Sequence, residues 1–399
     1  MALDRPIRVM TVFGTRPEAV KMAPLVQALN AHSDIESLVC VTAQHREMLD
    51  QVLDVFGIVP DDDLDIMEQR QTLGTITRKA LEGIERVIED RNPDIVLVHG
   101  DTTTTFAAAL AAFYKKVAIG HVEAGLRTYD KYSPFPEEMN RQLTDVLCDL
   151  FFAPTNLSAA NLEREGRPDE AVFITGNTAI DAMRTTVHED YHNELLDNLP
   201  KNSRIIYMTS HRRENLGVGL QNICKAVLRI VERFPDVHLI YPVHLNPRVR
   251  ETVFEVLGNH PRIHLIDPLG IVDNHNFMAR STLILTDSGG IQEEAPSLGI
   301  PVLVLRDTTE RPEGIQAGTL KLVGTVEENI YQEAVHLLTD DAAYQDMAGR
   351  KNPYGDGFAS DRIVKAILYH FGKSEAPSPF EYHKEDDSAK APEVAGTKK

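Results

Sequence analysis

Acidic side chains follow two consecutive predicted strands at the points where these strands end. The strand predicted at 95–98 runs into a His-Gly-Asp sequence that ends at Asp101, and the strand predicted at 117–122 is followed directly by Glu123. Because parallel strands carry ligand-binding residues at their carboxyl ends, we expect Asp101 and Glu123 at one edge of a sheet. A third carboxylate, Glu137, comes next along the chain. Carboxylates whose environments separate their pKa values can act as a general acid and a general base.

These carboxylates and the histidines beside them also have other possible roles. Asp101 could cap a helix that begins at Thr102. Glu123 has no such structural role, since an unpaired carboxylate at the end of a buried strand is costly. His99, Asp101, His121 and Glu123 could together bind a metal ion, but their spacing matches no recognised metal site. We therefore predict acid–base chemistry and no metal.

Basic side chains follow three other predicted strands. A turn containing Gly14 and Arg16 follows the first strand, where free backbone N–H groups would point at a bound anion, and Lys21 adds positive charge in the next helix. Two strands of the second half lead into His211 and His244, and His211 could shuttle a proton or contact a phosphate. An ordinary turn with an exposed arginine, and a loop histidine without a role, are the alternatives. Neither a Gly-x-Gly-x-x-Gly nor a Walker pattern is present, so we expect no dinucleotide cofactor and no nucleoside triphosphatase activity.

A glycine turn follows the strand predicted at 283–286. Its residues are Ser288, Gly289 and Gly290, whose backbone amides could bind an anion and whose small side chains let a phosphate approach closely. Glu294, one helical turn later, is placed to accept the two hydroxyl groups of a ribose. This turn therefore predicts a site for the phosphate and the ribose of a nucleotide.

Short β-branched runs alternate with longer segments of helical period along the chain. The strands are predicted at 7–13, 38–42, 95–98, 117–122, 151–153 and 172–175 in the first half, and at 204–209, 238–243, 263–266, 283–286 and 302–305 in the second. This alternation predicts an α/β protein with two Rossmann-like, doubly wound domains facing a cleft.

The domain boundaries follow from changes in composition. The first domain is predicted at 1–180 and the second at 203–357, separated by a polar linker. A helix at 358–373 is expected to pack back across the domains. Residues 374–399 are rich in Ser, Pro, Glu, Lys and Ala, which predicts a disordered tail.

The composition excludes several classes of protein. The chain has 399 residues with 60 acidic and 41 basic side chains, a formal charge of -19, which disfavours binding to nucleic acid or an anionic membrane. No apolar run approaches the ~18 residues that span a bilayer, and the N-terminus has no signal-like apolar core. Three widely separated cysteines fit reduced thiols. We therefore predict a cytoplasmic protein whose anionic ligand meets a local positive pocket.

The ordered motifs together resemble those of the non-hydrolysing UDP-N-acetylglucosamine 2-epimerases. The resemblance runs from about residue 7 to 372 and is carried by Phe13-Gly14-Thr15-Arg16-Pro17-Glu18, Gly100-Asp101-Thr102, His121-Val122-Glu123-Ala124-Gly125-Leu126-Arg127, Pro136-Glu137-Glu138, His211-Arg212-Arg213-Glu214-Asn215 and Asp287-Ser288-Gly289-Gly290-Ile291-Gln292-Glu293-Glu294. It implies the two-domain GT-B architecture, a homodimer and no cofactor. It also implies interconversion of UDP-N-acetylglucosamine and UDP-N-acetylmannosamine for cell-envelope polysaccharide synthesis, by elimination of UDP to 2-acetamidoglucal and re-addition.

The resemblance assigns roles to individual residues. It implies acid–base roles for Asp101, Glu123 and Glu137, with assistance from His211 at the diphosphate or in proton transfer. The residues implied in substrate binding are Arg16, His244, Ser288, Gly289 and Gly290 at the diphosphate, Glu294 at the ribose, and Lys21 and Arg311 in the charged lining.

Many bacterial members of this family bind a second UDP-N-acetylglucosamine as an activator. The matching positions here are Gln44, His45, Arg70 and Gln71. The chain departs from the family pattern at Glu47, where glutamine is frequent, and at Asn274, where an aromatic residue is usual and could stack on uracil.

Three other functions fit the same pattern of residues. A hydrolysing epimerase would let water consume the glucal and release free N-acetylmannosamine. A retaining GT-B glycosyltransferase would move the sugar to an acceptor. A nucleotide-sugar sensor would keep the binding site without turnover, although all three carboxylates and His211 are present.

Overall fold

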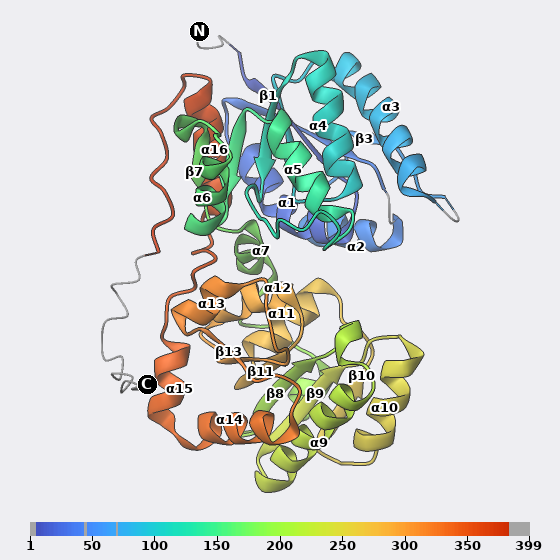
Figure 1. Cartoon of the computed structure of the whole chain (residues 1–399), viewed down its shortest axis with the longest axis vertical. Helices are drawn as coiled ribbons and strands as arrows, with labels where there is room; N and C mark the ends of the chain where they lie inside the picture. The colour runs from blue at the N-terminus through green and yellow to red at the C-terminus, as the bar shows by residue number, and fades with distance from the viewer. Residues whose placement is uncertain (1–4, 44–45, 69–70, 383–399) are drawn as a thin grey trace, which may run out of the picture. The chain divides into compact units, whose positions relative to one another are not determined.

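The chain folds into two compact units, each built around one parallel sheet (Figure 1). The computed structural model describes residues 5–43, 46–68 and 71–382. The N-terminal unit contains the described residues up to Asp190 together with Tyr354–Phe380, and the C-terminal unit contains Tyr191–Pro353 and residues 381–382. Two parallel sheets with helices in their connections confirm the predicted α/β class with two doubly wound domains.

The sheet of the N-terminal unit has the strand order β3-β2-β1-β4-β5-β6-β7. Its strands are β1 (Ile7–Phe13), β2 (Ile35–Val41), β3 (Asp62–Asp63), β4 (Ile95–His99), β5 (Ala118–Val122), β6 (Leu150–Ala153) and β7 (Val172–Ile174). Its helices are α1 (Arg16–Asn30), α2 (Arg46–Phe56), α3 (Leu73–Arg91), α4 (Thr103–Lys115), α5 (Glu137–Leu147), α6 (Asn156–Arg164), α7 (Thr178–Thr186) and α16 (Ala359–His370). The sequence analysis missed β3, because two aspartates carry no strand signal.

The sheet of the C-terminal unit has the order β10-β9-β8-β11-β12-β13. Its strands are β8 (Arg204–Thr209), β9 (Val237–Pro242), β10 (Ile263–Ile266), β11 (Leu283–Thr286), β12 (Val302–Val304) and β13 (Leu320–Leu322), the last of which was not predicted. Its helices are α8 (Glu194–Asp197), α9 (Val218–Arg233), α10 (Pro247–Leu257), α11 (Ile271–Ala279), α12 (Gly289–Glu294), α13 (Pro312–Ala317), α14 (Glu327–Thr339) and α15 (Asp341–Ala348).

Both sheets have a switch point, where the chain changes its direction of progress across the sheet. It lies between β1 and β4 in the N-terminal unit and between β8 and β11 in the C-terminal unit. Ligands of doubly wound folds bind beyond the carboxyl ends of the strands at such points. The segments that follow these four strands contain Arg16, Asp101, His211 and Ser288. The topology therefore puts predicted site residues at the switch point of each unit.

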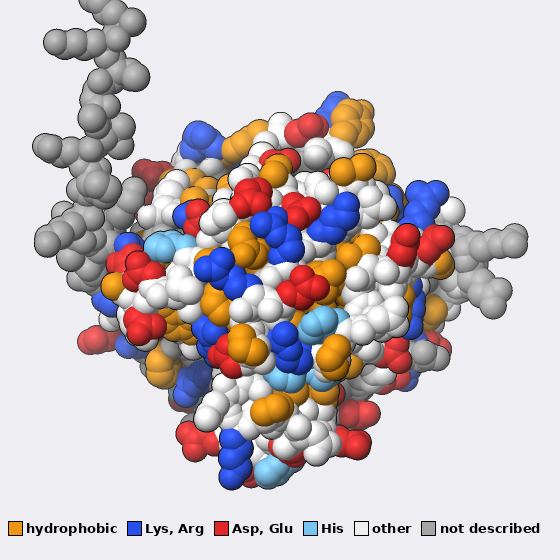
Figure 2. Space-filling model, turned by 90° about the horizontal axis from the view of Figure 1, so that it is seen from below, with side chains coloured by type: hydrophobic (Ala, Val, Ile, Leu, Met, Phe, Trp, Pro, Cys, Tyr) orange, Lys and Arg blue, Asp and Glu red, His pale blue; other side chains and the backbone are white. Residues whose placement is uncertain are grey.

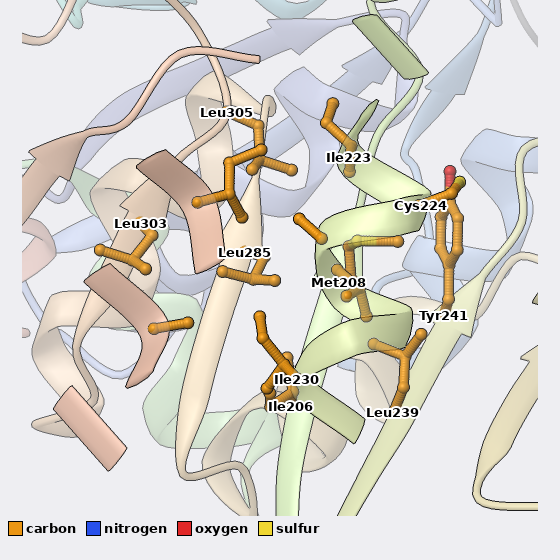
Figure 3. Packing of buried hydrophobic residues seen from close by; sticks show 14 of the residues in the cluster. Ile206, Met208, Ile223, Cys224, Ile230, Leu239, Tyr241, Leu285, Leu303 and Leu305 are labelled. Carbon is orange, nitrogen blue, oxygen red and sulfur yellow. The ribbon is translucent and has the colours of Figure 1, made fainter. Parts of the chain in front are cut away.

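The apolar stripe of α9 packs on the sheet of the C-terminal unit, as its spacing predicted. In Figure 3, Ile223 and Ile230 on α9 lie beside Met208 and Ile206 on β8, within one buried cluster. Ile230 has no exposed surface. Close packing of this kind makes the loss of a few methyl groups costly, because the cavity left behind closes only in part.

We expect Ile230→Ala to lower the free energy of unfolding by about 2–5 kcal/mol, the range for truncation of a buried aliphatic side chain. The measurement is urea unfolding followed by circular dichroism. Val326→Ala is the control, since Val326 is 54% exposed and its truncation should change the free energy by less than about 0.5 kcal/mol. Equal unfolding midpoints for Ile230→Ala and the wild type would contradict this packing.

The C-terminal helix α16 belongs to the N-terminal unit, where it packs against α1 and α7. The buried Asp181 side chain accepts hydrogen bonds from the backbone N–H groups of Ala359 (3.1 Å) and Ser360 (2.6 Å), so it binds the first turn of α16. Residues 374–382 of the predicted tail include Phe380, which is only 7% exposed and whose N–H donates to the carbonyl of Ile174 (2.7 Å). The rest of the predicted tail, 383–399, lies outside the described residues.

The surface carries charges of both signs. Figure 2 shows Lys and Arg side chains interspersed with Asp and Glu on the face in view. Within the described ranges, no helix combines the length and the apolar character needed to cross a membrane. Cys40, Cys148 and Cys224 are free thiols, and burial raises the pKa of Cys224 to about 12.

Candidate active site at the strand ends

The turn between β4 and α4 is held rigidly by side chains from three elements. Gly100 has a φ of 66°, a left-handed conformation that glycine adopts at little cost. Its N–H donates to the carbonyl of Val122 on β5 (2.9 Å). The three consecutive carbonyls of the turn are bound by Thr105 Oγ1 at His99 (2.5 Å), His121 Nε2 at Gly100 (2.7 Å) and Asn140 Nδ2 at Asp101 (2.9 Å). Asp101 therefore projects from a backbone with little freedom to move.

Asp101 does not cap α4, which was one of the alternative roles predicted for it. Thr102 is the N-cap of α4, and its Oγ1 accepts a hydrogen bond from the N–H of Thr105 (3.1 Å). Asp101 forms an ion pair with Arg141 on α5 instead, and its side chain is 27% exposed. The carboxylate of Asp101 is therefore paired with a cation and still partly exposed to solvent.

Glu123 occupies a strained backbone position directly after β5. Its φ is 66°, where a residue with a side chain pays of order 1–3 kcal/mol, and such strain clusters at functional sites. Its side chain, 12% exposed, forms an ion pair with Lys21 on α1 and lies 3.5 Å from His99 Nε2. Burial acts to raise the pKa of Glu123, but the Lys21 ammonium and His99 outweigh it and hold the pKa well below its ordinary value. Glu123 is thus a half-buried carboxylate whose surroundings favour its ionised form.

His99 is a second unusual residue at this point. Both of its ring nitrogens are buried, and neither has a hydrogen-bond partner among the described residues. The ring faces Glu123 rather than a cluster of ligands, and within the described parts of the chain no group of three or more His, Cys, Asp or Glu side chains could hold a metal ion. The sequence analysis considered His99 only as a metal ligand, and this contact with Glu123 had no signal in the sequence.

The backbone N–H groups of Gly14 and Thr15 in the β1–α1 turn bind a side chain of the chain itself, so these two groups are not free for an anion as predicted. Glu18 reaches back from the first turn of α1, and its Oε2 accepts the N–H groups of Gly14 (3.1 Å) and Thr15 (2.8 Å). Its other oxygen accepts the hydroxyl of Thr102 (2.8 Å), which joins the β1 turn to the β4 turn. The side chain of Arg16, the first residue of α1, is half-buried.

The two consecutive glutamates at the start of α5 have different roles. Glu138 is fully buried and accepts four hydrogen bonds, from Thr128 N (3.1 Å), Tyr129 N (2.9 Å), Arg141 Nη1 (3.1 Å) and Gln142 Nε2 (2.7 Å). Burial raises its pKa, but these donors more than compensate and the pKa is lowered. Glu137 is the first residue of α5 and is half-buried. Because four hydrogen-bond donors already bind the Glu138 carboxylate, Glu137 is the candidate of this pair for an acid–base role.

In the C-terminal unit, Asp287 organises the loop that carries His211. Asp287 is completely buried, and its Oδ2 accepts hydrogen bonds from Ser210 Oγ (3.0 Å), His211 N (2.9 Å), Arg212 N (2.9 Å) and Asn215 Nδ2 (3.0 Å). Its Oδ1 lies 3.4 Å from His211 Nδ1. The sequence analysis did not select Asp287, although its position directly after β11 was a usable signal.

His211 and His244 come together as stacked rings after β8 and β9. Their ring centroids are 5.6 Å apart with an interplanar angle of 14°. Burial lowers the pKa of His211. The positive charges of His244 and Arg212 also lower it, whereas the Asp287 carboxylate acts to raise it. The imidazole of His211 is therefore biased toward its neutral form, which can accept a proton.

The glycine turn after β11 lies against Arg311. A side chain at Gly289 would place its Cβ 3.2 Å from Arg311 Cζ, so glycine allows the guanidinium to approach the turn. Ser288 is the N-cap of α12, and Gly289 is its first helical residue. Arg311 is ion-paired with Glu293 (2.8 Å).

Glu294 lies beside His275, which the sequence analysis had not selected. Glu294 Oε2 is 3.4 Å from His275 Nε2, and the Glu294 side chain is 13% exposed. Asn274, the position where an aromatic residue was expected, accepts a hydrogen bond from the hydroxyl of Tyr207 (2.6 Å). This hydrogen bond links Asn274 on α11 to Tyr207 on strand β8.

Most of the positions predicted for an activator are not described by the structure. Gln44, His45 and Arg70 lie outside the described residues. Gln71 is half-buried, and its Oε1 is buried without a hydrogen-bond partner in the described part of the chain. These four residues stay a prediction.

The fold and the residues at its switch points define a class: two-domain α/β proteins with carboxylates after one sheet and a glycine turn with basic groups after the other. A family model described as UDP-N-acetylglucosamine 2-epimerase matches residues 27–368. A UDP-N-acetylglucosamine 2-epimerase from Bacillus subtilis is 60% identical over 377 residues, which cover 94% of this chain and 99% of that protein. The chain belongs to the UDP-N-acetylglucosamine 2-epimerase family, which confirms the predicted resemblance at the level of the family.

Two solved structures extend this similarity to the fold. The UDP-GlcNAc 2-epimerase from Neisseria meningitidis bound to UDP-GlcNAc is 50% identical with a TM-score of 0.81, and the match covers 91% of this chain and 100% of that chain. The Methanocaldococcus jannaschii enzyme in complex with UDP-GlcNAc and UDP is 34% identical with a TM-score of 0.73, with the same coverage of 91% and 100%.

Proposed function

We propose that this chain interconverts UDP-N-acetylglucosamine and UDP-N-acetylmannosamine without hydrolysing either. The observation that carries this proposal is Glu123, a half-buried carboxylate in a strained backbone position, whose pKa the neighbouring Lys21 holds well below its ordinary value. Asp101 follows the neighbouring strand of the same sheet. The relatives named above act on or bind this sugar nucleotide, which supports the choice of substrate. A homodimeric, cytoplasmic enzyme that supplies polysaccharide precursors is part of the same proposal.

The proposed reaction begins with elimination. The C2 proton of the sugar has no neighbouring ketone to acidify it, so it becomes removable only as the C1–O bond to UDP breaks and C1 gains positive charge. A carboxylate takes the C2 proton, the C–H electron pair forms the C1–C2 double bond of 2-acetamidoglucal, and UDP leaves with the C1–O electron pair. Re-addition of UDP with protonation of C2 from the opposite face gives the epimer.

The described residues fit the charges that this reaction creates. We assign the acid–base steps to Asp101, Glu123 and Glu137, with a neutral His211 assisting in proton transfer. Negative charge develops on the departing diphosphate, and donors aimed at developing charge supply the largest catalytic term in many enzymes. The proposed donors to UDP are Arg16, Lys21, His244, Ser288, Gly289, Gly290 and Arg311, with Glu294 at the ribose.

Incubation with UDP-N-acetylglucosamine alone in heavy water tests the proposal. We expect deuterium at C2 of both UDP-sugars and no release of free N-acetylmannosamine. Free N-acetylmannosamine as the main product would show a hydrolysing epimerase. Absence of deuterium at C2, together with transfer of the sugar to an added acceptor, would show a glycosyltransferase.

We also propose that a second UDP-N-acetylglucosamine activates the enzyme through Gln44, His45, Arg70 and Gln71. The expected result is a sigmoidal dependence of rate on UDP-N-acetylglucosamine, and a reverse reaction that needs a trace of that sugar nucleotide. Initial rates in both directions provide the measurement, with Gln71→Ala expected to weaken the sigmoidal response. Hyperbolic kinetics in both directions for the wild type would contradict the activator site.

A further inference from the structure

A buried ionic cluster lies behind the strand ends that carry Asp101 and Glu123. His121, the fourth residue of β5, contacts Asp145 Oδ1 on α5 through Nδ1 (2.6 Å). Arg127 Nη2 contacts Asp145 Oδ2 and Glu165 Oε2, both at 2.7 Å. The side chains of His121, Asp145 and Arg127 have no exposed surface. Only Glu165, which is 25% exposed, reaches the solvent.

The ring of His121 has an acceptor on each side. Its Nδ1 faces the Asp145 carboxylate, and its Nε2 lies 2.7 Å from the carbonyl oxygen of Gly100. A neutral imidazole carries one N–H and one lone pair. Either neutral tautomer would therefore place a lone pair against an oxygen at hydrogen-bond distance, in a site with no exposed surface. Only the doubly protonated ring satisfies both contacts.

We infer that His121 is a permanent imidazolium that positions Asp101 and Glu123 for the proposed reaction by donating hydrogen bonds to Asp145 and to the Gly100 carbonyl. The inference rests on the proposed function for its catalytic consequence, and on geometry alone for its protonation state. His121 is a positioning residue, because it acts on the reaction through the backbone of the β4–α4 turn.

The charges in the cluster balance when His121 is protonated. Two cations, His121 and Arg127, then face two carboxylates, Asp145 and Glu165. With a neutral His121, Arg127 alone would face two carboxylates across the whole cluster, Asp145 and the partly exposed Glu165, and buried charges are costly unless paired.

Protonated Asp145 is the competing arrangement, and its other contacts oppose it. Asp145 Oδ2 accepts from Arg127 Nη2 (2.7 Å) and from Gly125 N (3.3 Å), two donors that favour a carboxylate. Burial acts to raise the pKa of Asp145, but His121 and Arg127 outweigh it and lower the pKa. Asp145 also acts on Cys148, and burial raises the pKa of this thiol well above its ordinary value.

The contacts of Gly100 explain how this charge aligns the two carboxylates. Gly100 donates its N–H to the carbonyl of Val122, and its own carbonyl contacts His121 Nε2. Residues of β5 therefore bind both the N–H and the C=O group of Gly100. Asp101 is the next residue along this turn, and Glu123 is the next residue after β5. Loss of the His121 bond frees the peptide between Gly100 and Asp101 to rotate, which changes the separation of the two carboxylates.

Neutron diffraction from the deuterated full-length protein tests the protonation state directly and needs no variant. We expect deuterium on both Nδ1 and Nε2 of His121 at neutral and mildly alkaline pH, and none on the oxygens of Asp145. Nuclear density for only one deuteron on the ring, or for a deuteron on Asp145, would overturn the inference.

Kinetics of His121→Gln test the positioning role. Because a displacement of about 1 Å can cost 10²-fold in rate, we expect kcat to fall about 100-fold while KM and the affinity for UDP change little. His238→Gln is the matched control: His238 is a buried histidine of β9 that bonds to His264 (3.1 Å), and its substitution should leave kcat unchanged. A folded His121→Gln variant with a wild-type kcat would overturn the positioning role.

The two measurements separate failure of this inference from failure of the proposed function. A wild-type enzyme that incorporates no deuterium at C2 contradicts the function, whatever the neutron map shows. If His121→Gln does not fold by circular dichroism, Asp145→Asn provides the second variant, since it removes the counter-ion that favours the imidazolium and should lower kcat with little change in KM. A wild-type kcat for Asp145→Asn would also overturn the positioning role.

Discussion

Glu123→Gln is expected to lower kcat by about 10²–10⁴-fold, the usual contribution of a positioned general acid or base. The substitution keeps the shape of the side chain and removes the negative charge that accepts a proton. UDP affinity should change little, because Glu123 is assigned to the sugar rather than to the diphosphate. The measurements are steady-state kinetics, calorimetric titration with UDP and the rate of deuterium incorporation at C2.

Glu163→Gln is the matched control for this variant. Glu163 lies on α6 of the same unit and is exposed, so its amide variant should keep the wild-type rate. Near wild-type turnover in Glu123→Gln would remove Glu123 from the acid–base assignment and with it the observation that carries the proposed function.

The same variant has a pH-dependent effect on stability. The pKa of Glu123 is lower in the folded chain than its ordinary value, so the ionised carboxylate stabilises the fold above that ordinary value. This stabilisation is lost as the pH falls through the folded pKa. We therefore expect the difference in unfolding midpoint between wild type and Glu123→Gln to shrink on acidification.

Asp287→Asn is expected to lower kcat by about 10²–10⁴-fold while the protein remains folded, because it changes which nitrogen of His211 carries a proton. The amide oxygen can still accept the four donors that now meet Asp287 Oδ2. The amide nitrogen then replaces Oδ1, which lies 3.4 Å from His211 Nδ1. A donor at this place favours the wrong tautomer of His211, with its proton on Nε2.

Kinetics and thermal unfolding together test this second prediction. Asp267→Asn is the control, since Asp267 belongs to the same unit and its side chain is 80% exposed. A drop in kcat without a comparable drop in melting temperature supports the tautomer argument. Full activity in Asp287→Asn would show that the contact with His211 Nδ1 has no role in the reaction.

The carboxylates of the N-terminal unit could be found from local sequence. Asp101 and Glu123 follow short apolar runs that can only be buried strands of an α/β fold, and a residue after such a strand lies at the ligand-binding edge. The parallel register of β4 with β5, in which Val98 faces His121, confirms that the two strands are neighbours. Local patterning sufficed because strand ends depend on the hydrophobicity of adjacent residues.

The choice between consecutive glutamates needed the structure. Glu137 and Glu138 are the same residue type in the same helical turn, and only the donors supplied by Thr128, Tyr129 and Arg141 show that Glu138 is structural. The wrong expectation for the Gly14 amide has the same origin, because the side chain of Glu18 takes the hydrogen bond that a free turn would offer to a ligand.

The sequence by itself determined the class of fold, the strand ends that bear chemistry and the family, because these depend on local periodicity and on residues in fixed order. Tertiary structure alone decided which ionisable groups are paired and how their surroundings shift their pKa values. Asp287 binds Arg212 from 75 residues away, and His121 binds Asp145 from 24 residues away. The charge state of an ionisable group depends on how deeply the fold buries it and on neighbours from distant parts of the chain. Neither can be predicted from the residues next to it in sequence.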